Sequence, residues 1–296
     1  MELKEFGQTW QGRAQNSILQ IYDLASRETT VVARIPQVIE APMWSKDGKA
    51  LVYNSKGSIY RCDIATGAIT LVPTGAAIAC NNDHVLAPDG SGIAISGNVE
   101  DSIVSKIYIY DFAKKELREV VSAPWSYLHG WSPDMKTLAY CAGRSVGDGM
   151  EWDIYTCPAE GGPETRLTDA PGLDDGPEYS SDGKTIWFNS ARTGLMQVWK
   201  MDADGADQTQ MTFDEDRNSW FPHISPDLQK VVYLAYHKGD LEPGQHLPDK
   251  QVEIRMIPAA GGQPETLVKL FGGQGSINVN NWSPDSTRFA FVSYEP

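Results

Sequence analysis

The sequence predicts a single all-β domain, a six-bladed β-propeller made of four-stranded antiparallel blades. Two repeated motifs and the incomplete repeats at the two chain ends support this prediction. The chain has 296 residues, enough for one large all-β domain. Aromatic residues make up 10% of the chain, which also favours strands, because flat rings pack well on a pleated surface.

The first motif is an apolar residue, then Ser or Ala, then any residue, then Asp, followed by alternating apolar residues. Its six copies are PMWSKDGKALVY, HVLAPDGSGIAI, HGWSPDMKTLAY, PEYSSDGKTIWF, PHISPDLQKVVY and NNWSPDSTRFAF. Their aspartates are Asp47, Asp89, Asp134, Asp182, Asp227 and Asp285. A period of roughly 40–50 residues with β patterning is typical of propeller blades. Since Pro, Asp and Gly favour tight turns, we interpret each copy as a hairpin turn with a structural aspartate.

The second motif lies between copies of the first and is a strand that runs into a turn. It occurs as SIYRCDIATG, KIYIYDFAKKE, DIYTCPAEGG, QVWKMDADG and EIRMIPAAGG. Each copy is followed by a short apolar stretch that predicts one more strand. Each blade therefore has four strands, named A to D from the centre of the ring outward.

The chain ends share the sixth blade. The N-terminal part supplies C-like and D-like strands at residues 18–23 and 30–32, and the C-terminal part supplies A and B around Trp282 and residues 289–291. We expect one domain over residues 1–296, with blade six shared between about residues 276–296 and 15–34. Pairing the two ends removes the open edge that a ring of blades would otherwise have.

Charge and cysteine usage limit the partners and the compartment. The formal net charge of −14 argues against nucleic acid and anionic membranes as partners. The four cysteines form no CxxC pair, which favours reduced thiols in the cytosol. The sequence contains no signal peptide and no run of 18 apolar residues. We therefore expect a cytoplasmic protein without membrane insertion, or a periplasmic one if a leader has been trimmed.

The functional face follows from strand direction. Strands alternate within a blade, so the B–C and D–A loops lie on one face, here called the long-loop face. It receives the long segments 96–106, 142–153 and 236–252, and long loops gathered on one face mark the functional side. Polar residues just before the A strands ring the mouth of the central channel there. The candidate binding residues are His84, His129, Asp175, Glu178, Trp220, His223 and Asn280.

Three functions are consistent with these residues. The first is a protein- or peptide-binding scaffold that uses the long-loop face. The second is a metal-assisted lyase or hydrolase acting on an acidic sugar or peptide; it requires at least three of the mouth histidines and carboxylates near one point. The third is a sensor of a small ligand in the channel, with Trp125 and Trp220 as stacking surfaces. We assign no catalytic residue, metal ligand or cofactor, with a divalent metal at the mouth as the alternative.

The repeats also resemble a known family. WSPDMK, followed by IY and then by turns such as PAEGG or MDADG, is similar to the TolB family propeller and to the propellers of dipeptidyl peptidases. The resemblance runs from about residue 18 to the end and implies a six-bladed, TolB-like propeller. TolB itself is periplasmic and carries an extra α/β domain, and the peptidases carry a Ser-His-Asp domain. The sequence has neither an export signal nor a G-x-S-x-G motif, so the resemblance implies a binding module rather than a hydrolase.

Overall fold

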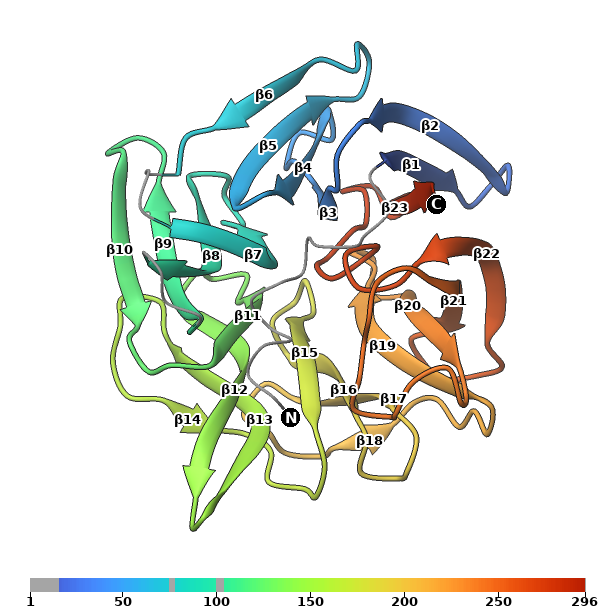
Figure 1. Cartoon of the computed structure of the whole chain (residues 1–296). Helices are drawn as coiled ribbons and strands as arrows, with labels where there is room; N and C mark the ends of the chain where they lie inside the picture. The colour runs from blue at the N-terminus through green and yellow to red at the C-terminus, as the bar shows by residue number, and fades with distance from the viewer. Residues whose placement is uncertain (1–15, 75–77, 100–103, 296) are drawn as a thin grey trace.

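The computed structural model describes residues 16–74, 78–99 and 104–295 and arranges their strands as blades around a centre (Figure 1). The first blade is β3 (Glu40–Trp44), β4 (Ala50–Ser55), β5 (Ser58–Asp63) and β6 (Ile69–Val72). The second is β7 (Ile78–Leu86), β8 (Gly92–Val99), β9 (Lys106–Asp111) and β10 (Glu116–Val121). The third is β11 (Ser126–Trp131), β12 (Thr137–Val146), β13 (Gly149–Pro158) and β14 (Thr165–Arg166).

The remaining blades follow the same order. The fourth blade is β15 (Asp174–Tyr179), β16 (Thr185–Ser190), β17 (Gln197–Asp202) and β18 (Thr209–Gln210). The fifth is β19 (Arg217–Ile224), β20 (Lys230–His237), β21 (Lys250–Pro258) and β22 (Glu265–Gly272). The sixth is β23 (Arg288–Glu295), β1 (Asn16–Asp23) and β2 (Glu28–Ile35). Neighbouring strands pair antiparallel within every blade, which confirms the six-bladed propeller.

The sixth blade joins the two ends of the sequence, as expected. β23 pairs with β1 at eight positions, from Asn16 opposite Glu295 to Asp23 opposite Arg288, and the two strands lie side by side in Figure 1. The expected innermost strand is reduced to one bridge between Trp282 and Phe289. The ring is therefore closed by hydrogen bonds between residues far apart in the sequence.

The repeated turn has the same hydrogen bonds in most blades. Ser45 Oγ donates to Asp47 Oδ1 at 2.6 Å, and the same carboxylate oxygen accepts the Lys49 amide at 3.1 Å. Equivalent serine–aspartate bonds form in blades three to six. In the second blade Ala87 replaces the serine, and Asp89 still accepts the Ser91 amide. The aspartates stabilise turns, as the repeat predicts.

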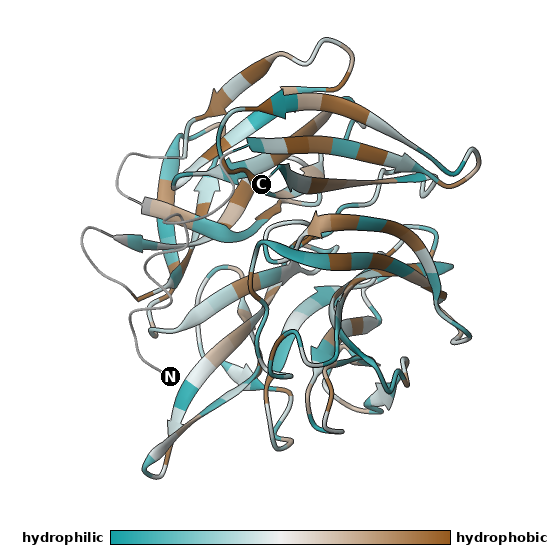
Figure 2. Ribbon diagram, turned by 45° about the vertical axis from the view of Figure 1, so that its right-hand side comes forward, coloured by the Kyte–Doolittle hydropathy of each residue, from teal (hydrophilic) through white to brown (hydrophobic). Residues whose placement is uncertain are grey.

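Apolar side chains fill the spaces between blades. Figure 2 shows hydrophobic and hydrophilic residues interspersed along many strands, but an inner strand such as β4 (Ala50–Ser55) is buried at every position. Since successive side chains point to opposite faces, both faces of the inner part of this blade are covered. Trp44 lies in a cluster with Leu19 and Ala290, which joins the first and sixth blades. Trp131 lies in a cluster with Ala94, which joins the third and second blades. These two motif aromatics therefore pack between blades.

The long segments have different structures. Residues 142–153 are not an irregular loop, because β12 and β13 continue as a hairpin until Val146 pairs with Gly149. The Tyr127 and Trp152 rings, 6.0 Å apart, pack against its base. Residues 238–249 form the expected loop between β20 and β21, whereas residues 100–103 of the segment 96–106 lie outside the described residues. Within the described ranges no helix is long and apolar enough to cross a membrane.

Candidate functional site at the channel mouth

Bulges near the start of the A strands decide which side chains reach the channel mouth. The pairing register shifts between Asp175 and Glu178 in β15, and between Trp220 and His223 in β19. Gly176 and Phe221 have positive φ at these bulges. A bulge re-aims side chains because it breaks the strict two-residue alternation of a strand. Identical sequence positions can therefore face different surroundings.

His129 lies between two carboxylates at the mouth. Its Nε2 is 3.2 Å from Asp175 Oδ1 and 3.9 Å from Asp83 Oδ1. Its Nδ1 is 3.4 Å from the carbonyl oxygen of Asn278. Asp175 Oδ1 also accepts the Gly176 amide at 2.6 Å. The three charged side chains come from β7, β11 and β15, so they join three blades.

Burial and mutual charge set the protonation of this cluster. Burial alone would lower the pKa of His129, but the Asp83 and Asp175 carboxylates outweigh it and raise the pKa to about 9. Burial would raise the pKa of Asp175, yet the charge of His129 holds it at about 2. Burial raises the pKa of Asp83 to about 7 against the opposing effect of His129. At neutral pH the cluster therefore holds an imidazolium, a carboxylate and a titrating acid.

The loop between β20 and β21 contributes a residue that the sequence-based prediction missed. His246 Nε2 lies 3.9 Å from Asp175 Oδ2. The ring centroid of His246 lies 4.5 Å from that of Trp220 and 5.3 Å from that of Phe221. The sequence could have indicated His246 as a candidate binding residue, because it lies in the segment 236–252 of the long-loop face.

Three more predicted residues, Glu178, His223 and Asn280, form a hydrogen-bonded group that connects blades, here called the Glu178 tie. His223 Nδ1 lies 2.6 Å from Glu178 Oε2, and its Nε2 contacts the Ile277 carbonyl oxygen. Glu178 Oε1 accepts hydrogen bonds from the Ile224 amide at 3.2 Å and from Asn280 Nδ2 at 2.6 Å. Because both oxygens of Glu178 have partners within the protein, this group links blades four, five and six.

Two other predicted residues are fully buried. His84 has no exposed surface, and neither of its ring nitrogens has a hydrogen-bond partner among the described residues. The bulge in β7 precedes it, so it lies in the regular ladder opposite Ile95, and burial lowers its pKa to about 4. Trp220 is also completely buried, with the His246 ring centroid 4.5 Å from its own, so no ligand can stack on it while His246 stays in place.

The positions of the histidines and carboxylates at the channel mouth test the enzyme alternative. No group of three or more His, Cys, Asp or Glu side chains in the described ranges is arranged to hold a metal ion. The residues required for the enzyme alternative divide into the His129–Asp175 pair, the Glu178–His223 pair and the separate His84. The structure does not support that alternative.

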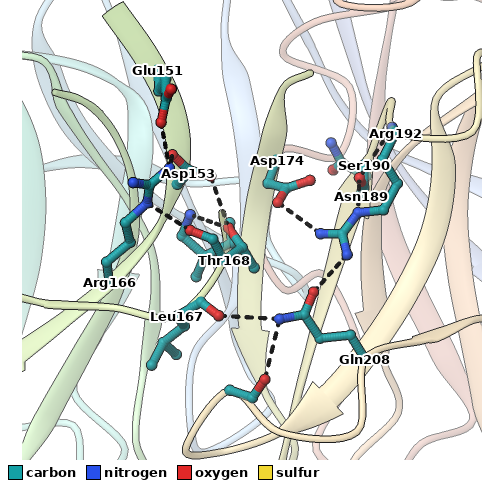
Figure 3. A network of polar contacts seen from close by, with 12 residues as sticks. Glu151, Asp153, Arg166, Leu167, Thr168, Asp174, Asn189, Ser190, Arg192 and Gln208 are labelled. Carbon is teal, nitrogen blue, oxygen red and sulfur yellow. Dashed lines mark hydrogen bonds and ion pairs between the residues drawn. The ribbon is translucent and has the colours of Figure 1, made fainter. Parts of the chain in front are cut away.

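Arginine–carboxylate ion pairs lie between blades three and four, near the long-loop face. Arg166 Nη2 lies 2.6 Å from Glu151 Oε2 and 2.7 Å from Asp153 Oδ2 (Figure 3). Arg192 Nη2 lies 2.7 Å from Asp174 Oδ2. Arg144, on the hairpin, pairs with Glu164. Arg144 and Arg192 therefore both bind carboxylates within the protein.

Comparison with known proteins agrees with this architecture. The family model described as TolB beta propeller domain matches residues 101–254. The chain belongs to this family. An uncharacterized protein of Agrobacterium fabrum is 43% identical over 289 residues, which cover 97% of this chain and 96% of that protein.

A solved structure supports the assignment to the TolB propeller family. It comes from Agrobacterium tumefaciens and is provisionally described as TolB. It matches with a TM-score of 0.88 and 43% identity, covering 96% of this chain and 100% of that chain. The Tol-Pal system protein TolB of Francisella tularensis is 27% identical over 285 residues, covering 92% of this chain. The chain spans 60% of the length of that TolB protein, so the likeness concerns part of it.

Proposed function

We propose that this propeller binds a protein or peptide through its long-loop face. The observation that carries the proposal is the place of the exposed apolar side chains. Four large ones lie on this face. Val146 and Met150, in the β12–β13 hairpin, are 43% and 46% exposed, and Phe213 and Leu247, in loops, are 73% and 43% exposed. Exposed apolar groups cost free energy in a protein that stays unbound, and their concentration favours a binding surface.

The exposed apolar residues elsewhere have another explanation. Val31, Ile69 and Leu71 lie on β2 and β6, the outermost strands of two neighbouring blades. Outermost strands expose one side to solvent in any propeller, and single exposed apolar residues are normal there. These positions therefore provide matched controls for the long-loop face.

Site-specific photocrosslinking in cells tests the proposal. A photoreactive amino acid replaces Met150 or Phe213 on the long-loop face, or Leu71 on β6. We expect crosslinks to one dominant protein from Met150 and Phe213 and none from Leu71. Once that protein is purified, Phe213→Asp should weaken its binding at least tenfold, and Leu71→Asp should not. Crosslinks from Leu71 alone would contradict the proposal.

Two expectations from the sequence stay predictions. The first is a cytoplasmic location, which fractionation of cells producing the native protein would test. The second is that binding requires no metal or cofactor, which mass spectrometry for metals on untagged protein would test. Stoichiometric metal lost in His129→Ala would contradict the second.

A further inference from the structure

His246 is packed at the channel mouth by ring contacts without a hydrogen bond to the carboxylate it faces. The 3.9 Å between its Nε2 and Asp175 Oδ2 exceeds hydrogen-bond distance. Its Nδ1 is buried and has no hydrogen-bond partner among the described residues. The side chain is 22% exposed, whereas Asp175 below it is 9% exposed. His246 therefore covers an ionised carboxylate with a poorly matched ring.

The surroundings of His246 have the chemistry of a cation site. Aromatic rings attract cations through their faces, and a carboxylate forms short, charge-assisted hydrogen bonds with ammonium or guanidinium groups. Trp220 and Phe221 supply the rings. Asp175 supplies the carboxylate: its Oδ1 pairs with His129, and its Oδ2 faces His246. Burial lowers the pKa of His246, so near neutral pH its ring brings no charge to this place.

We propose that His246 occupies the place of a lysine or arginine side chain of the partner, which displaces it and binds between Trp220, Phe221 and Asp175. This inference rests on the proposed function, because it names the chemistry of the group that the long-loop face recognises. The shared feature is a cationic side chain on a protein segment. His246 then acts as an internal competitor that lowers affinity for segments lacking that charge.

The charge of the face favours such a partner. The long loops of blades three to five carry exposed acidic residues: Asp148, Asp169, Glu215, Asp240 and Glu242. Two more, Glu151 and Asp216, are paired with Arg166 and Arg217. Lys238 is an exposed cation in the same loops, and the nearby Arg144 and Arg192 are already paired with carboxylates. Complementary charge speeds association and selects against acidic partners.

The loop that carries His246 is held by local hydrogen bonds, such as that from the Gln245 amide to the Glu242 carbonyl oxygen at 2.9 Å. Gly239 has a φ of 93° with open space around it, and the loop is anchored further along by the bond from Tyr236 Oη to the Leu247 carbonyl oxygen, 2.9 Å. Rotation of the His246 side chain, or movement of the segment from 239 to 246, would uncover Asp175. At the mouth itself, such a movement breaks the ring contacts with Trp220 and Phe221 and the attraction between His246 and Asp175.

Titration calorimetry with three blocked peptides tests the inference. The probes are acetyl-Gly-Lys-Gly-amide, its arginine counterpart and its glutamine counterpart, each titrated into the full chain and into His246→Ala. Removing the competitor should strengthen binding of a cationic peptide at least tenfold, and the glutamine peptide should not bind. The lysine and arginine arms show which cation fits better.

Two further variants locate the binding. Asp175→Asn in the His246→Ala background should abolish binding of the cationic peptide, and Trp220→Leu should weaken it. Asp204→Asn, on the opposite face, is the matched control and should leave it unchanged. Equal affinity of the wild type and His246→Ala, or equal binding of the glutamine peptide, would overturn the inference. Crosslinks at Met150 and Phe213 would be unaffected by that result, so failure of the inference is distinct from failure of the proposed function.

Discussion

His129 and Asp175 face each other across the seam between blades three and four, with 3.2 Å between Nε2 and Oδ1. Both side chains are less than one-tenth exposed. A pair taken out of water in this way must keep both charges, because losing one leaves the other buried and uncompensated. The stability of the ring is therefore linked to the protonation of a residue at the candidate binding site.

This link predicts a loss of stability at alkaline pH. The carboxylates of Asp83 and Asp175 overcome the effect of burial and raise the pKa of His129 from 6.5 to about 9. Its stabilising contribution is therefore complete below pH 6.5 and lost as pH rises to 9. A shift of this size corresponds to about 3 kcal/mol. Urea unfolding should show this decline in the wild type and not in His129→Asn; parallel pH profiles would contradict it.

The Glu178 tie predicts a large cost for one substitution. Glu178→Ala leaves His223, the Ile224 amide and Asn280 without their shared acceptor. Breaking a buried pair costs about 3 kcal/mol or more, so the midpoint of urea unfolding should fall. Glu160, 94% exposed, gives the control Glu160→Ala, which should change the free energy of unfolding by less than about 0.5 kcal/mol. Equal costs would show that the tie contributes nothing.

His84 predicts an effect in the acidic range. Burial lowers its pKa from 6.5 to about 4, so the folded state holds the neutral ring. Its contribution is present above pH 6.5 and is lost as pH falls to 4. His84→Leu should remove that part of the acid-induced loss of stability, as measured by thermal unfolding between pH 7 and 4. An unchanged slope would mean that the ring is protonated in the fold.

The polar network between blades three and four (Figure 3) predicts that the charge of Asp174 affects the pKa of Asp153. Burial and the charge of Asp174 together raise the pKa of Asp153 to about 6, against the opposing charge of Arg166. Asp174→Asn should therefore lower the pKa of Asp153, which carbon NMR of the carboxyl group would measure. Asp169→Asn, an exposed neighbour, is the control. No change with Asp174→Asn would show that the two groups do not interact.

The sequence supports the fold more fully than the site because the fold repeats. Each repeated turn is a local arrangement of a few residues, five of the six with a serine–aspartate bond, so the six copies can be read directly from the chain. The direction of His84 and His129 cannot be read in this way. Both lie five residues before their motif aspartate, yet bulges at different places turn one into the core and the other toward the mouth.

The site also depends on residues distant in sequence. His246 meets Asp175 because a loop between β20 and β21 folds over the mouth, and no local pattern specifies where a loop tip lies. The sequence predicts a loop at residues 142–153 because its exposed strands lack apolar alternation. The structure forms a hairpin there, whose pairing depends on cross-strand hydrogen bonds and on the contact between Trp152 and Tyr127. Such contacts appear only when the chain is folded.

Hydrogen exchange on the complex with the crosslinked partner tests the central claim most directly. The account predicts slower exchange at the hairpin tip, residues 145–151, and in the loops at residues 211–216 and 238–249, with no change in the turns at residues 45–49 and 180–184 on the opposite face. Protection confined to those turns, or to β2 and β6 at the rim, would show that the partner binds elsewhere and would contradict the long-loop face as the binding surface.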